Sequence, residues 1–127
     1  MAVIRDVMPV FELYQPGSID DAIKLVEQNG DRFYLPELLR MRARVLLSLP
    51  QPRSDEAESC FTKSLELSRR HGAVAWELRT AIDLAELLAE RRRGEEAGLL
   101  LRPVLDRFVE GSDTADIRAA RQVLEVL

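Results

Sequence analysis

The stretch Leu84–Ala97, which reads LAELLAERRRGEEA, constrains the fold of this chain more than any other. Leu84 and Leu88 are one helical turn apart, while the small residues Ala85 and Ala97 lie on opposite sides of a turn rich in arginine. Small side chains let two helix backbones approach closely, and leucines at this spacing form one buried face. The stretch therefore predicts two antiparallel helices joined by a short turn.

Apolar residues recur at steps of three and four through most of the chain, so every predicted element is a helix. The residues 2–14 are strongly apolar and are interrupted by Pro9. Serines precede several helices as candidate caps, and glycines follow several as stops. The predicted helices cover residues 20–28, 34–49, 55–71, 75–92, 95–109 and 114–127, with Ser18, Ser54 and Ser112 or Asp113 as caps and Gly72 and Gly111 as stops.

Two of the predicted helix pairs repeat along the chain. Glu37-Leu38 corresponds to Glu77-Leu78, and Glu56-Ala57 corresponds to Glu96-Ala97. A helix pair cannot bury its apolar face alone, and stacking on neighbouring pairs solves this problem. We therefore expect an all-α fold of tetratricopeptide-like antiparallel pairs stacked in a small superhelix, with a period longer than the usual ~34 residues. A compact helical bundle is the alternative.

The same pattern predicts one domain over residues 1–127. Divergent N-terminal helices fall in residues 1–30, and a C-terminal helix falls in residues 112–127. The two repeats occupy residues 34–72 and 73–111.

Residues 33–127 resemble the C-terminal helical-repeat segment of large bacterial signalling ATPases that carry a cyclase or helix-turn-helix regulator domain. Ala43 stands where that family usually has glycine, and Ser112 stands where it usually has an aromatic residue. The resemblance implies a sensing or protein-interaction role, because the family's chemistry lies in upstream domains that this chain lacks. The matching stretches are FYLPELL (33–39), EAESCFTKSLEL (56–67), WELR (76–79), LAELL (84–88), RPV (102–104) and EGSDTADIR (110–118).

Composition narrows the possible partners and the compartment. The hydrophobic fraction of 46% and the charged fraction of 31% are typical of a folded chain, not of a disordered one. A net charge of −4 argues against a nucleic acid as partner. No apolar run reaches the ~18 residues of a membrane span, and the N-terminus lacks a basic leader. The single cysteine, Cys60, fits a reducing compartment, so we expect a cytoplasmic protein.

No pattern in the sequence indicates catalysis, a metal or a cofactor. His71 is the only histidine and precedes Gly72 at a helix end, where it complements the helix dipole. Cys60 is in mid-helix beside Phe61, which predicts a buried small residue. Acidic pairs such as Asp55-Glu56 open helices, and helix electrostatics explains them. No glycine-rich phosphate loop is present. We expect a protein that is not an enzyme.

Two surfaces are candidates for binding. The inner face of the first helix of each pair carries Arg40, Arg44 and Asp83, with Trp76 as a packing anchor or a ligand platform. The arginines, including Arg91–Arg93, form either an anion-binding patch or solvated salt bridges such as Glu37–Arg40 and Glu86–Arg91.

The terminal helix is the second candidate, because repeat arrays need polar caps. Its apolar side chains either fold back on the stack or bind a second copy of the chain. We expect a protein-interaction or regulatory module that binds a protein partner and self-associates; the alternative is a small-molecule sensor with an apolar pocket near Trp76. The expected oligomer contacts are Ile117, Val123, Leu124 and Leu127.

Overall fold

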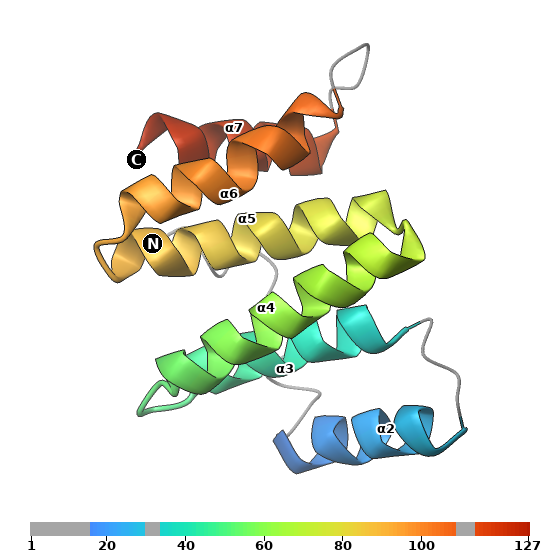
Figure 1. Ribbon diagram of the computed structural model, residues 1–127. Helices are drawn as coiled ribbons and strands as arrows, with labels where there is room; N and C mark the ends of the chain where they lie inside the picture. Colours follow the sequence, from blue (N-terminus) through green and yellow to red (C-terminus); the bar gives the residue numbers. More distant parts are fainter. Residues whose placement is uncertain (1–15, 30–33, 109–113) are drawn as a thin grey trace.

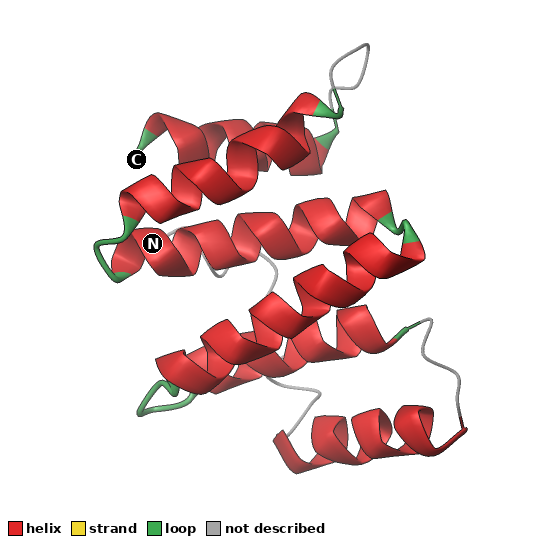
Figure 2. Cartoon of the chain, viewed as in Figure 1, coloured by secondary structure: helices red, strands yellow, loops and turns green. Residues whose placement is uncertain are grey.

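A computed structural model describes residues 16–29, 34–108 and 114–127, and every regular element in these ranges is a helix (Figures 1 and 2). The predicted all-α class is confirmed. The apolar residues 2–14 and the predicted caps Ser112 and Asp113 lie outside the described residues. The helices are α2 (Pro16–Asn29), α3 (Leu35–Ser48), α4 (Ser54–His71), α5 (Val74–Glu90), α6 (Gly94–Asp106) and α7 (Ala115–Glu125).

Helix α5 occupies the centre of the fold. It packs against α4 on one side and α6 on the other, and it also contacts α3 and α7 (Figure 1). From Glu77 to Leu88, every residue of α5 except Arg79 is buried. A helix that is buried on nearly all sides is one that its neighbours surround, and this one also buries four polar or charged side chains. The stretch that begins at Leu84 therefore belongs to the best-enclosed part of the described chain.

Alanines and one aromatic ring define the main core. Ala85 and Ala97, predicted to lie where α5 and α6 approach, are both completely buried. Phe61 fills the space between α4 and its neighbours, where large buried side chains contribute most to stability. A second, smaller apolar cluster attaches α2 to the rest of the chain. It contains Leu35, Leu39 and Leu67, with Ile23 and Val26 of α2 packed against them.

The ends of the helices follow local capping chemistry with some differences from the sequence prediction. Gly72 ends α4 in the left-handed conformation, with φ of 66°, as predicted. Helix α5 ends at Glu90, because Arg92 adopts φ of 62° in the turn before α6. Thr114 caps α7 by accepting a hydrogen bond from the backbone N–H of Ile117.

Two predicted serine caps were wrong. Ser18 lies inside α2, and Ser54 is the first helical residue of α4. The cap position of α4 belongs to Arg53, whose side chain makes no capping hydrogen bond. Among the helices of the described ranges, none is long and apolar enough to cross a membrane.

Candidate functional site

The predicted groove residues lie along the seam between α3 and α5. Arg40 Nη1 donates to Asp83 Oδ2 at 2.8 Å, and Arg40 Nη2 donates to Glu37 Oε2 at 3.2 Å. The expected Glu37–Arg40 pair is confirmed. Burial opposes the charge of Arg40, but the Glu37 hydrogen bond and the charge of Asp83 outweigh it and raise the pKa of Arg40. The seam is thus an ion-pair network that joins neighbouring helix pairs.

Burial changes what this seam can offer to a partner. Arg44 and Asp83 are buried, and the Arg40 side chain is largely buried. The expectation that these three residues line an open groove is therefore corrected: neutralisation by neighbouring carboxylates lets Arg40 remain inside the fold. The structure brings Arg40 and Asp83 together as contacts between helices.

An aromatic pair marks the accessible end of the same seam. The ring centroids of Tyr34 and Trp76 are 5.8 Å apart with an interplanar angle of 47°, a favourable tilted arrangement. Trp76 is two helical turns before Asp83, so both lie on the α3-facing side of α5. Trp76 is partly buried, whereas Tyr34 is 57% exposed. The seam is therefore aromatic at this end.

A further ion pair continues this face from α5 to α7. Arg79 Nε donates to Asp116 Oδ2 at 3.0 Å, and both side chains are partly exposed. Because α5 also contacts α3, ion pairs connect α3, α5 and α7 in succession. The face is polar along most of its length and aromatic at Tyr34 and Trp76.

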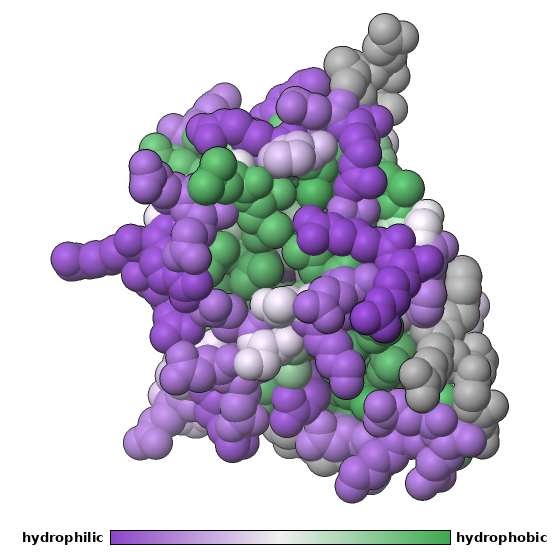
Figure 3. Space-filling model, in the orientation of Figure 1, coloured by the Kyte–Doolittle hydropathy of each residue, from purple (hydrophilic) through white to green (hydrophobic). Residues whose placement is uncertain are grey.

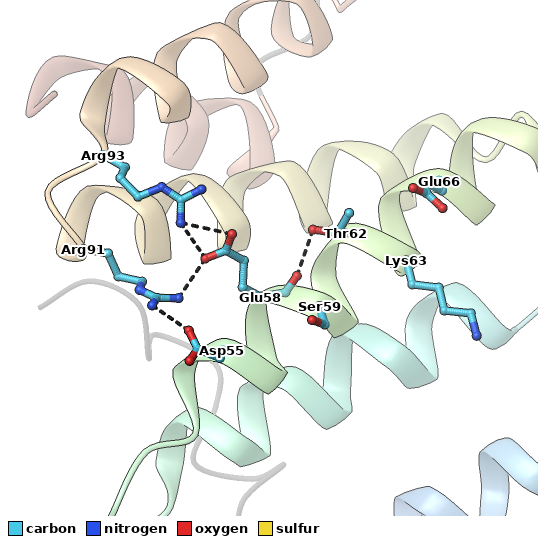
Figure 4. A pocket seen from close by; sticks show the side chains of 8 residues that line it. All are labelled: Asp55, Glu58, Ser59, Thr62, Lys63, Glu66, Arg91 and Arg93. Carbon is cyan, nitrogen blue, oxygen red and sulfur yellow. Dashed lines mark hydrogen bonds and ion pairs between the residues drawn. The ribbon is translucent and has the colours of Figure 1, made fainter.

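A polar cleft of about 590 Å³ lies between α4 and the turn that joins α5 to α6 (Figure 4). It was not predicted from the sequence. In Figure 3, apolar side chains gather over α5 and α6 on the face shown, and hydrophilic ones surround them. The cleft is lined by Asp55, Glu58, Ser59, Thr62, Lys63, Glu66, Arg91 and Arg93.

Two arginines close one end of this cleft. Glu58 Oε1 accepts hydrogen bonds from Arg91 Nη1 and Arg93 Nη1, both at 2.8 Å, and Arg91 Nη2 reaches Asp55 Oδ1 at 2.6 Å (Figure 4). Arg91 thus pairs with α4 instead of with Glu86. Salt bridges neutralise Arg91 and Arg93, and the cleft can hydrogen-bond polar groups without strongly favouring either charge. The acidic residues near the start of α4 are visible in the sequence, but only the packing of α4 against the α5–α6 turn shows that Asp55 and Glu58 face Arg91.

The charges at this turn influence one another's ionisation. The hydrogen bonds that Arg93 donates to Glu96 and Glu58 raise the pKa of Arg93, and the bond to Glu96 lowers the pKa of that carboxyl group. Both groups are therefore held in their charged forms.

The positions and contacts of His71 and Cys60 are those of residues with a structural role. His71 is exposed in the last turn of α4. Cys60 is buried, and its Sγ accepts a hydrogen bond from Arg42 Nη1 at 2.9 Å. Burial opposes the charge of Arg42, but hydrogen bonds to Asp20 and Cys60 raise its pKa overall. In the ranges that the structure covers, no three His, Cys, Asp or Glu side chains are grouped to hold a metal ion.

The expected oligomer contacts divide into buried and exposed residues. Ile117 and Val123 are buried in this chain's own core, and Leu124 packs partly against it. Of the two alternatives for this apolar face, the structure shows the first, because α7 folds back on α5 and α6. The prediction that Ile117 and Val123 are oligomer contacts is therefore corrected. Leu127 is exposed, and Val126 is 79% exposed.

Comparisons with known proteins add no relative. No family model matches the chain, and the comparisons with curated proteins and with solved structures find no match either. The resemblance to the helical segment of signalling ATPases therefore stays a prediction from the sequence.

Proposed function

We propose that this chain is a non-catalytic protein-interaction and regulatory module of a bacterial cytoplasmic signalling system, built as a tetratricopeptide-like stack. Two features support the stack: α3–α4 and α5–α6 are consecutive antiparallel pairs, and corresponding residues of the two pairs are buried. Ala57 and Ala97 correspond in this way, as do Phe61 and Leu101. Stacked pairs present long faces to protein partners.

The observation that carries the interaction role is an aromatic pair, the exposed Tyr34 and the partly buried Trp76, beside a seam of paired charges. Tyr34 and Trp76 offer rigid apolar area with polar atoms at the rim, which is the composition of interface hot spots. The ion pairs Arg40–Asp83 and Arg79–Asp116 hold the helices that carry the pair. A partner segment that inserts an apolar side chain against the two rings fits this surface.

A comparison of two surface variants tests this role. Tyr34→Ser removes the exposed ring, and Leu25→Ser removes an equally exposed apolar side chain from α2, since both residues are 57% exposed. We expect chemical cross-linking in a bacterial extract, followed by quantitative mass spectrometry, to yield partners that Tyr34→Ser loses and Leu25→Ser keeps. The same partners recovered with both variants and the unmodified chain would contradict the assignment to this surface.

Self-association is the second element of the proposal. The exposed Val126 and Leu127 at the end of α7 are the remaining candidates, because Ile117 and Val123 are enclosed. Light scattering over a wide concentration range should show an oligomer that Val126→Asp converts to a monomer. Deleting α7 would expose core residues, so the point variant is the sharper test. A monomer at every concentration would refute self-association.

A further inference from the structure

A buried carboxylate joins two arginines at the edge of the molecule away from the α5–α6 turn. Glu77 lies in the first turn of α5, and its side chain is only 3% exposed. Its Oε2 accepts a hydrogen bond from Arg69 Nε at 3.0 Å and a second one from Arg107 Nη2. Both arginines therefore converge on the same oxygen atom.

The two arginines come from different helix pairs. Arg69 is in the last turn of α4, and Arg107 directly follows α6, so the ends of these helices meet beside the start of α5 (Figure 1). Strongly hydrophilic side chains cover this edge in the space-filling view (Figure 3). The side chains of Arg69 and Arg107 are 50% and 52% exposed. Each guanidinium thus has one anchored side and one side open to water.

The charges in this contact do not balance. One carboxylate neutralises one guanidinium, so the group of Glu77, Arg69 and Arg107 carries a net positive charge. The nearest exposed acids along the chain, Glu66 and Asp106, form no ion pair with either arginine in the part of the chain that the structure describes. Each guanidinium also retains N–H donors beyond the one that Glu77 uses.

The other carboxylate contacts of the described helices differ from this one. Arg79 and Asp116 form a one-to-one pair with no excess charge. Arg91 and Arg93 share Glu58, but Asp55 and Glu96 supply further carboxylates there. The contact at Glu77 combines a buried orienting group, two convergent guanidiniums and an excess of positive charge, and this combination suits an oxyanion.

We propose that Arg69 and Arg107, positioned by Glu77, form a binding site for a phosphate group. A phosphate monoester carries about −1.5 to −2 charges at neutral pH and several acceptor oxygens, so it can accept hydrogen bonds from two guanidiniums at once. A carboxylate brings a single charge and fits this pair less well. Glu77 directly follows Trp76 on α5, but the phosphate test substitutes neither Tyr34 nor Trp76, so its outcome is independent of the proposed interaction role.

The test uses the full chain and inorganic phosphate as the probe, at an ionic strength held constant with chloride. Nitrogen-15 NMR should show saturable shifts of the Arg69 and Arg107 Nε–H signals, and calorimetry gives the affinity. Arg107→Ala should weaken phosphate binding about tenfold, because it removes one charged donor. Arg79→Ala, which removes a comparably exposed arginine, should bind phosphate as the unmodified chain does.

Three results would overturn the site: shifts that chloride alone reproduces, equal phosphate affinity in the Arg107→Ala and Arg79→Ala variants, or equal affinity for acetate and phosphate. Circular dichroism establishes that each variant is folded. Arg107→Lys keeps the charge but loses the planar donor geometry. It should bind phosphate more weakly than the unmodified chain and more tightly than Arg107→Ala, which keeps the test decisive if the alanine variant unfolds.

Discussion

Replacing Glu77 with glutamine measures how much the buried carboxylate contributes to stability. The substitution keeps the volume and a neutral acceptor but removes the charge that Arg69 and Arg107 share. Helices α4 and α6 end beside the first turn of α5, so the contact links these three helices. We expect Glu77→Gln to destabilise the fold without changing its helical content.

The structure allows the size of this effect to be worked out. A hydrogen bond to a charged group contributes about 1.5–3 kcal/mol, so two such bonds would give about 3–6 kcal/mol. Both arginines are about half exposed, and water screens the exposed halves. Halving the total leaves about 2 kcal/mol, which corresponds to a fall in Tm of roughly 8 °C for a chain of this size.

Urea denaturation followed by far-ultraviolet circular dichroism provides the assay, with thermal melting as a second measurement. Asp116→Asn is the matched control, because Asp116 pairs with one partly exposed arginine near the start of a helix. Its effect should stay below about 1 kcal/mol. If Glu77→Gln is no more destabilising than Asp116→Asn, the carboxylate is not a structural link, and the reasoning from burial is wrong.

Four further substitutions probe the core, the backbone conformation at a helix end and the stability in acid. Phe61→Ala should cost about 3–5 kcal/mol in urea denaturation, because it empties a fully buried site; a loss below about 1 kcal/mol would contradict the packing. Gly72→Ala should cost about 1–2 kcal/mol, since a Cβ meets no neighbour there but φ is 66°. Gly94→Ala should be close to neutral by the same measurement, and equal losses at the two glycines would refute the role of backbone strain. Arg93 lowers the pKa of Glu96 below 4.5, so ionised Glu96 stabilises the fold above that pH, and this contribution is lost as the pH falls. Denaturation at several acidic pH values should show a shallower loss for Glu96→Gln, and identical pH profiles would exclude the effect.

Local sequence was sufficient wherever a single helix or turn decides the outcome. The left-handed end of α4 follows from Gly72, because glycine adopts positive φ without a steric penalty. The burial of Ala85 and Ala97 follows from their spacing around a short turn. Glu37 and Arg40 are about one helical turn apart on the same helix, so helical periodicity alone predicts their contact.

Contacts between segments that are far apart in the sequence could not be predicted in the same way. Arg91 forms ion pairs with Asp55 and Glu58, which lie on a different helix. Spacing along the sequence suggested Glu86 as its partner instead. The enclosure of Ile117 and Val123 depends on α7 folding back on α5 and α6. A helical pattern identifies an apolar face, but it does not say whether that face meets the same chain or another one.

The sequence by itself therefore determined that the chain is helical, which faces of its helices are apolar and where several of those helices begin and end, because these properties arise from interactions within a few residues. Only the tertiary structure decided which charges meet. Arg69, Glu77 and Arg107 are far apart along the chain and converge because α4 and α6 end beside the first turn of α5. The same packing buried Arg40 and Asp83 as a pair, since a charge enters the interior only where folding brings it an opposite charge.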